Sequence, residues 1–244
     1  MSGDIEQRPE GLMKLSGTIQ NYKVTRASAN FVFTDSDKTT LGVVAIAAGI
    51  AGLSGQAIST ASSTSAEENA DYVEFDLNDM PVKGWLWRSP FKEGDVVDVA
   101  AEWRGDHYEA GGIVRPEDHT IALYPHCSRG RTRHIKNAVK WGGIFFLVFV
   151  LLFEIAGLSI RGLDRSMTLF SSAPHLWSIL GIACFFSLMI FSVTRKWMVF
   201  VRLAEKVFRT LGLPDPSNID LVKSSKAQRK PEDPGAFGTF YFRY

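Results

Sequence analysis

Two apolar runs, each about 20 residues long, constrain this chain more than any other feature of its sequence. Residues 141–160 (WGGIFFLVFVLLFEIAGLSI) contain a single charged residue, Glu154, and residues 174–194 (PHLWSILGIACFFSLMIFSVT) contain none. About 20 apolar residues in a helix span the ~30 Å hydrocarbon core of a bilayer. A helix of a soluble domain normally has a polar face, and neither run has one. The pattern predicts two transmembrane helices joined by a short connection at 161–173.

Basic residues on the outer flanks of the two runs predict how this hairpin is oriented. The connection carries only Arg161 and Arg165, offset by Asp164, whereas cations are concentrated in the segment 129–140 and after residue 194. Cations are retained on the cytoplasmic side of a membrane, so we expect both termini in the cytoplasm and the connection outside. The cations that we expect to set this topology and to contact anionic lipid are Arg129, Arg131, Arg133, Lys136, Lys140, Arg195, Lys196 and Arg202.

Residues 12–128 show the pattern of a small β-rich cytoplasmic domain, after a disordered N-terminus at 1–11. Short alternating segments are separated by Gly, Pro and Asp turns, and the phrase FKEGDVVDV (91–99) is typical of OB-like barrels. We therefore predict a small β-barrel or sandwich of the OB-like kind. Trp85 and Trp87 beside Arg88 are the candidates for an aromatic binding platform. Their alternation places both tryptophans on one face, which favours a core position for them.

An uncharged Gly/Ala-rich segment at 39–65 interrupts the β-rich domain. The spacing of Gly49, Gly52 and Gly55 brings small residues together along one helix, a pattern that allows close helix approach. We predict an inserted helix that docks on the barrel or a partner chain or forms a homo-oligomer. Reversible membrane contact and a fixed third span are the alternatives. The third span conflicts with the predicted topology, because residues 1–38 contain no export signal.

The chain after the second run continues as an amphipathic helix at 195–212 and then a tail at 213–244. The helix either lies on the inner leaflet or covers the barrel, and Gly212 and Pro214 end it. The tail closes with the aromatic sequence FGTFYFRY. Such an ending favours strand addition, either to a sheet edge of this chain or to a partner.

The sequence contains no catalytic motif. His107, His119, His126, His134 and Cys127 lack the paired spacing of a zinc site, and no nucleophile elbow, phosphate loop or dinucleotide fingerprint occurs. We therefore expect a non-enzymatic protein without cofactor, metal site or nucleic-acid partner. Glu154 is a functional candidate because a carboxylate within a span is costly. The alternative is that Glu154 lies close enough to the outer interface to reach water.

Four phrases of the chain resemble those of a known family. They are GWLWRSPFKEGDVVDV, IALYPHCSRGR, KWMVFVRLAEKVF and DLVKSSKAQRKPEDPGAFGTFYFRY. The chain resembles, from about Leu15 to Tyr244, bacterial membrane proteins that are commonly labelled putative type VI secretion system effectors. The resemblance implies a place in the inner membrane and in contact-dependent competition between bacteria, and it supplies no catalytic residues.

Three functions are consistent with these observations. The first is an immunity protein that binds and neutralises a membrane-active toxin. The second is an effector whose Gly/Ala segment or hairpin inserts into a target membrane, and the third is a structural or adaptor subunit of an envelope machine. The expected partners are membrane lipid and a cognate toxin or immunity protein. The strong hairpin favours the first function, because a secreted toxin must stay soluble until delivery.

Overall fold

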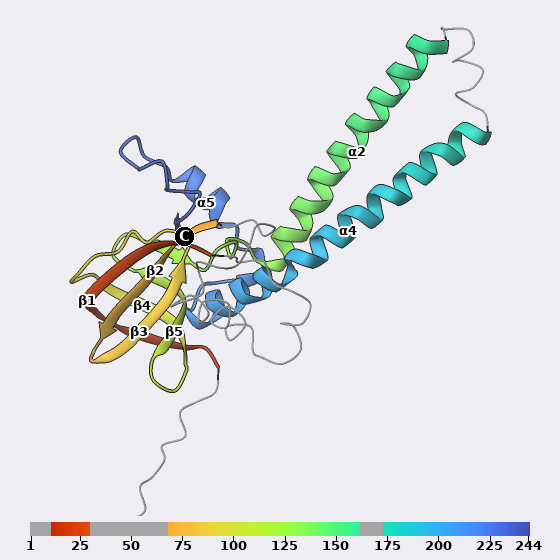
Figure 1. Ribbon diagram of the computed structural model, residues 1–244. Coiled ribbons are helices and arrows are strands. Elements are labelled where there is room, and N and C mark those ends of the chain that lie inside the picture. The colour runs from red at the N-terminus through yellow and green to blue at the C-terminus, as the bar shows by residue number, and fades with distance from the viewer. Residues whose placement is uncertain (1–10, 30–67, 162–172) are drawn as a thin grey trace, which may run out of the picture. The chain divides into compact units, whose positions relative to one another are not determined.

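The computed structural model describes residues 11–29, 68–161 and 173–244 (Figure 1). The chain divides into two compact units. A barrel unit comprises Met1–Arg131 and Phe200–Tyr244, and a helical unit comprises Thr132–Val199. The predicted disordered N-terminus, the inserted helix 39–65 with Gly49, Gly52 and Gly55, and nearly all of the connection 161–173 lie outside the described residues.

Five strands form a closed barrel, as the sequence predicts. They are β1 (Met13–Ala29), β2 (Glu68–Leu77), β3 (Met80–Leu86), β4 (Val96–Trp103) and β5 (Tyr108–Arg115). Strand β1 pairs antiparallel with β2 and β4, while β2 pairs with β3 and β4 with β5. The parallel pairs Val82–Tyr108 and Lys83–Glu109 join β3 to β5 and close the barrel. Strand β6 (Thr120–Leu123) continues the sheet from β5.

Alternation along the strands fills the barrel interior. In β2, Val73, Phe75 and Leu77 are buried, and the residues between them are half-buried. Asn78 and Asp79 then connect β2 to β3 with positive φ angles of 52° and 63°. Asn and Asp tolerate this left-handed conformation, which a two-residue hairpin turn requires. The tight turn fixes the register that points the apolar residues of both strands inward.

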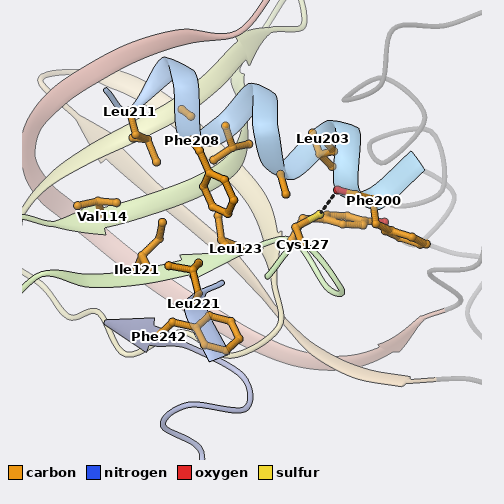
Figure 2. Close-up of a cluster of buried hydrophobic side chains, with 14 of the residues drawn as sticks. Val114, Ile121, Leu123, Cys127, Phe200, Leu203, Phe208, Leu211, Leu221 and Phe242 are labelled. Atoms are coloured by element: carbon orange, nitrogen blue, oxygen red, sulfur yellow. Dashed lines mark hydrogen bonds between the residues drawn. The ribbon is translucent and has the colours of Figure 1, made fainter. Parts of the chain in front are cut away.

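A second apolar core lies on the outer face of the barrel. The last part of α4 (Ala173–Thr210) supplies Phe200, Leu203 and Phe208, which pack with Leu123 and Leu221 (Figure 2). The opposite face of this helix is exposed and basic, with Arg202, Lys206 and Arg209. Of the two predicted positions for residues 195–212, the structure supports the helix that covers the barrel, because the barrel already buries its apolar face.

The C-terminal tail folds back onto the same unit. It contains a 3₁₀ turn (Pro216–Asn218), the short helix α5 (Leu221–Ala227) and strand β7 (Phe242–Arg243), which pairs with β6. The sequence did not predict α5, which begins after Asp220, whose carboxylate accepts the Lys223 N–H. The Arg243 guanidinium lies over the Phe237 ring and contacts the Asp233 carboxylate. The aromatic tail therefore adds a strand to its own sheet.

The helical unit consists of two long helices, α2 (Arg131–Arg161) and the first part of α4. The two helices extend beyond the predicted apolar runs in two places. Helix α2 begins ten residues before Trp141, so most of the basic segment 129–140 is helical, and the predicted amphipathic helix 195–212 continues the second apolar run without a break. A Cβ on Gly142 would lie 2.4 Å from Ile190 Cδ1, so glycine lets the two helices approach closely there.

Candidate functional site

The most prominent surface of the helical unit is apolar. Both helices are long and apolar enough to cross a membrane, and their most apolar 18-residue windows are 0% and 6% buried. Large side chains such as Leu147, Phe185 and Leu188 are 63–66% exposed. Soluble monomers rarely expose a continuous apolar surface of this extent. The composition of this surface is that of a lipid-facing surface.

Glu154 does not stand alone in this helical unit. Its Oε1 lies 3.2 Å from Nε2 of His175, which comes from the other helix. The side chains are 24% and 11% exposed, respectively. The structure provides an intramolecular partner that the sequence did not predict, and both the functional role of Glu154 and its access to water stay predictions. The pairing offsets part of the cost of placing a carboxylate among apolar residues.

The predicted lipid-contacting cations fall into two groups. Most of them are exposed, namely Arg131, Lys136, Lys140, Arg195, Lys196 and Arg202, and Arg133 is half-exposed. Arg129 differs, because its Nε lies 3.1 Å from the Asp220 carboxylate and the two residues also form a backbone bridge. Arg129 therefore attaches the C-terminal tail to the loop before α2, and its contact with lipid stays a prediction.

The candidate aromatic platform is closed over by other residues. Trp85 is 1% exposed and its ring centre lies 5.1 Å from that of Tyr72. Burial and the nearby Glu109 and Glu74 carboxylates raise the pKa of Tyr72 to about 12. Trp85 points out of the barrel but belongs to the outer core, so the core interpretation of Trp85 agrees with the structure.

Trp87 is half-buried by contacts inside the barrel unit, whereas the Arg88 side chain is 46% exposed. The Trp87 ring lies 5.0 Å from the His126 ring and 5.4 Å from that of Phe240, so the tail packs against it. Arg88 Nε is 3.9 Å from the Asp71 carboxylate. The role of these two residues in a binding platform therefore stays a prediction.

Two residues near the junction of β6 and α2 have partners that the sequence did not predict. His126 Nε2 lies 3.0 Å from the Glu68 carboxylate, and burial lowers the pKa of His126 against the opposing effect of Glu68. The Cys127 thiol donates a hydrogen bond to the Phe200 carbonyl (Figure 2), and burial raises its pKa, which makes it a poor nucleophile. No local motif marks these residues, because their partners lie far along the chain.

A further titratable cluster lies at the β4–β5 turn. His107 contacts the Glu109 and Asp106 carboxylates at 3.3 and 2.7 Å, and these contacts raise its pKa. Within the described ranges, no group of three or more His, Cys, Asp or Glu side chains has the geometry to hold a metal ion.

The described residues thus define a class of architecture: a closed five-stranded barrel with an outer helix-covered core, joined to two long apolar helices. No family model, no curated protein and no solved structure matches the chain.

Proposed function

We propose that this is a non-enzymatic, multi-pass protein of the bacterial inner membrane that acts in type VI secretion-linked competition as an immunity protein. In this proposal α2 and α4 cross the membrane, both termini are cytoplasmic, and the barrel unit or the hairpin binds and neutralises a membrane-active toxin. The observation that carries the proposal is the exposed apolar surface of both helices. Exposed cations lie just before the apolar part of α2 and just after that of α4.

The orientation is supported by where the cations lie along the helices. Lys136 and Lys140 precede the apolar part of α2, and Arg195 and Lys196 follow that of α4. The close approach of Gly142 to Ile190 makes the helices antiparallel neighbours, so these four cations belong to the same end of the hairpin. Cations at one end favour retention of that end in the cytoplasm.

A binding role is supported by the connectivity of the barrel. Its strands follow one another around the barrel in the order β1-β2-β3-β5-β4, with β3 and β5 parallel. This order agrees with an OB-like barrel, and barrels of that kind serve as binding modules. The barrel interior is filled by side chains such as Val73, Val97 and Val99, so any partner binds outside it.

Residence in the producing cell's own membrane is supported by the continuity of α4. The helix runs from its apolar part directly into the outer core of the barrel unit, where Phe200, Leu203 and Phe208 are buried. A secreted toxin must conceal its apolar helices until delivery. The apolar windows of α2 and α4 are almost entirely uncovered, and a resident anchor has no need to cover them.

Reporter fusions test the topology. Reporters after Tyr124 and at Tyr244 should be active in the cytoplasm, and a reporter inserted between Arg165 and Ser172 should be active outside. A periplasmic signal from either of the first two positions would overturn the proposed orientation.

Expression of the full-length chain, with and without the product of the neighbouring gene, tests the function. An immunity protein is harmless alone and protects the host against that product. The alternative is a membrane-inserting effector, which the close spacing of Gly49 and Gly52 favours, and it predicts loss of membrane potential when the chain is expressed alone. In that case Gly49→Leu together with Gly52→Leu abolishes the depolarisation. Neither toxicity nor protection would favour the third candidate, an adaptor subunit.

A further inference from the structure

We propose that the protonation state of His107 controls how firmly the barrel is closed. The closure consists of two parallel pairs, Val82 with Tyr108 and Lys83 with Glu109, which we call the seam. When both ring nitrogens carry a hydrogen, the His107 ring joins two carboxylates beside the seam, and loss of one hydrogen makes one of these contacts repulsive. The proposal concerns the barrel unit alone and goes beyond the proposed function, on which it does not depend.

The seam is the weakest connection between neighbouring strands of the barrel. Its two residue pairs are fewer than those of any other pairing of β1 to β5. Beyond the seam the two backbones approach closely, because a Cβ on Gly84 would lie 2.7 Å from the Ala110 carbonyl oxygen. Val82 is 0% exposed and Tyr108 is 7% exposed, so an open seam uncovers core residues. A region held by so few backbone contacts opens at a low free energy.

His107 lies in the turn from β4 to β5, directly before the seam residue Tyr108. Its carbonyl oxygen accepts a hydrogen bond of 2.9 Å from the Arg104 N–H, which fixes the backbone of the turn. The ring then lies between two carboxylates, with Nδ1 at 2.7 Å from Asp106 Oδ1 and Nε2 at 3.3 Å from Glu109 Oε2. The Asp106 side chain is 80% exposed and that of Glu109 is 7% exposed. The ring therefore connects an exposed turn to the buried side of the seam.

The number of hydrogens on the ring decides whether both contacts are attractive. Ionised carboxylates only accept hydrogen bonds, so both ring nitrogens must donate, and only the imidazolium form does this. In the neutral ring one nitrogen is an acceptor that faces a carboxylate oxygen. The hydrogen bonds to Glu109 and Asp106 raise the pKa of His107 against the opposing effect of partial burial.

The sign of the pH dependence follows from that direction. Because the folded pKa of His107 lies above the unfolded value of about 6.5, the stabilisation is fully present below pH 6.5. It disappears as the pH rises through the folded pKa. The seam should therefore be firmest in mild acid and loosen in mild alkali.

Other charged and titratable groups surround the cluster. Lys83 of β3 lies opposite Glu109 in the seam and contacts Glu74 of β2 at 3.4 Å. The remaining groups are Tyr72 of β2, Glu102 and Arg104 at the end of β4, and Tyr124 after β6. Burial is the main cause that raises the pKa of Tyr72, to about 12, and that of Tyr124 is also raised, so neither hydroxyl ionises between pH 6 and pH 9. All of these groups are retained in the variants below, so a comparison at equal pH isolates His107.

Hydrogen–deuterium exchange of the full-length protein in detergent, followed by mass spectrometry, tests the proposal. Peptides that cover 80–86 and 104–111 report on the seam, and their exchange rates at pH 6 and pH 9 are corrected for the intrinsic rates. The reference is His107→Gln, whose side chain stays neutral at both pH values. The protection of the wild-type seam relative to this reference should fall by about five-fold from pH 6 to pH 9.

A second variant keeps the carboxylate of Glu109 and removes the repulsion. Asp106→Asn changes an exposed residue, and its new amide N–H can donate to Nδ1 of a neutral ring while Nε2–H donates to Glu109. Protection of the seam in this variant should be the same at pH 6 and pH 9. If His107→Gln does not fold, the comparison of wild type with Asp106→Asn decides the same question. The matched control is His119→Gln in the β5–β6 turn, which should retain the wild-type profile.

Three results would overturn the proposal. The first is a wild-type protection, relative to His107→Gln, that is equal at pH 6 and pH 9. The second is a wild-type profile in Asp106→Asn. The third is an equal fall in peptides from β1, which does not border the seam, because His107 would then act on the whole barrel.

Discussion

The barrel unit and the helical unit contain the same kinds of apolar residue and place them oppositely. Leu77 and Val99 in the barrel are 0% exposed, whereas Leu151 and Leu152 in α2 are 59–60% exposed. The difference follows from pattern rather than composition. Strands that alternate apolar and polar residues form one buried face, whereas helices that are apolar all round have no polar face to turn toward water.

The two units also differ in how their charged residues are paired. In the barrel unit Arg26 pairs with Asp71, and Arg115 pairs with Asp95 and Asp118, all at 2.7–2.8 Å and partly open to water. In the apolar part of the helical unit the ion-pair contact of the described residues is Glu154 with His175. Polar groups fix loops and strand ends in the barrel unit, and the Glu154–His175 pair joins the apolar parts of two helices in the other.

The largest expected effect comes from replacing leucine by alanine once in each unit. Leu77→Ala removes a fully buried side chain from the barrel and should lower the free energy of unfolding by about 2–5 kcal/mol. Leu151→Ala removes an exposed side chain that we assign to lipid and should change it by less than about 0.5 kcal/mol. Denaturant unfolding of the full-length protein in detergent measures both. Equal losses would show that Leu151 is packed against protein.

A second pair of variants adds one methyl group to each unit. A Cβ on Gly130 would lie 2.1 Å from the Pro216 carbonyl oxygen, which is backbone and cannot rotate away. Gly130→Ala should therefore destabilise the barrel unit by about 1–3 kcal/mol. The control is Gly143→Ala in α2, where no atom lies within 4 Å of the added carbon and the helix itself gains from alanine. A neutral Gly130→Ala would contradict the tight contact between the β6–α2 loop and the tail.

The smallest expected effect concerns pH in the barrel unit. Partial burial acts to raise the pKa of Asp118, but hydrogen bonds from Arg115 and Thr120 hold it at about 2. Because this pKa lies below the unfolded value of about 3.9, the stabilisation is present above pH 4 and disappears as pH falls toward 2. The Asp118 side chain is 39% exposed, so screening limits the contribution to about 1 kcal/mol.

Asp118→Asn should therefore be less stable than wild type at pH 7 and nearly equal to it near pH 2. Urea unfolding at several pH values gives the comparison, with Asp79→Asn in the exposed β2–β3 turn as the control. A difference that persists unchanged at pH 2 would mean that Asp118 acts through packing rather than through its charge.

Features carried by local pattern were predictable from the sequence. Short alternating segments separated by Gly, Pro and Asp turns predicted a small β-barrel or sandwich, and two uniform apolar runs predicted the long helices. The amphipathic end of α4 was also predictable as a helix, because its apolar residues recur every three to four positions. The sequence did not decide whether membrane lipid or the barrel covers the apolar face of this helix. In the structure, the outer core of the barrel unit covers it.

Features that depend on distant contacts were not predictable. The β3–β5 closure, the Arg129–Asp220 pair and the Glu154–His175 pair all join residues that carry no local signal of each other. Polar residues interrupt the alternation of strand β1, so the local pattern does not predict it as one continuous strand. The structure describes one strand to Ala29, with a register shift between Gln20 and Lys23 that absorbs the interruption.

The barrel unit is discontinuous, since Thr132–Val199 separates its strands from the helix end and tail that cover them. A ribosome delivers these parts in order, so β1 to β6 emerge first and the hairpin next. Phe200, Leu203 and Phe208 emerge only after both apolar runs have been synthesised. Until then the outer face of β5 and β6 remains uncovered, because the residues that bury Ile121 and Leu123 have not been made. The outer core of the barrel unit can therefore form only after the hairpin has been synthesised. A chain that ends before Phe200 keeps an exposed apolar face, which quality-control proteases recognise.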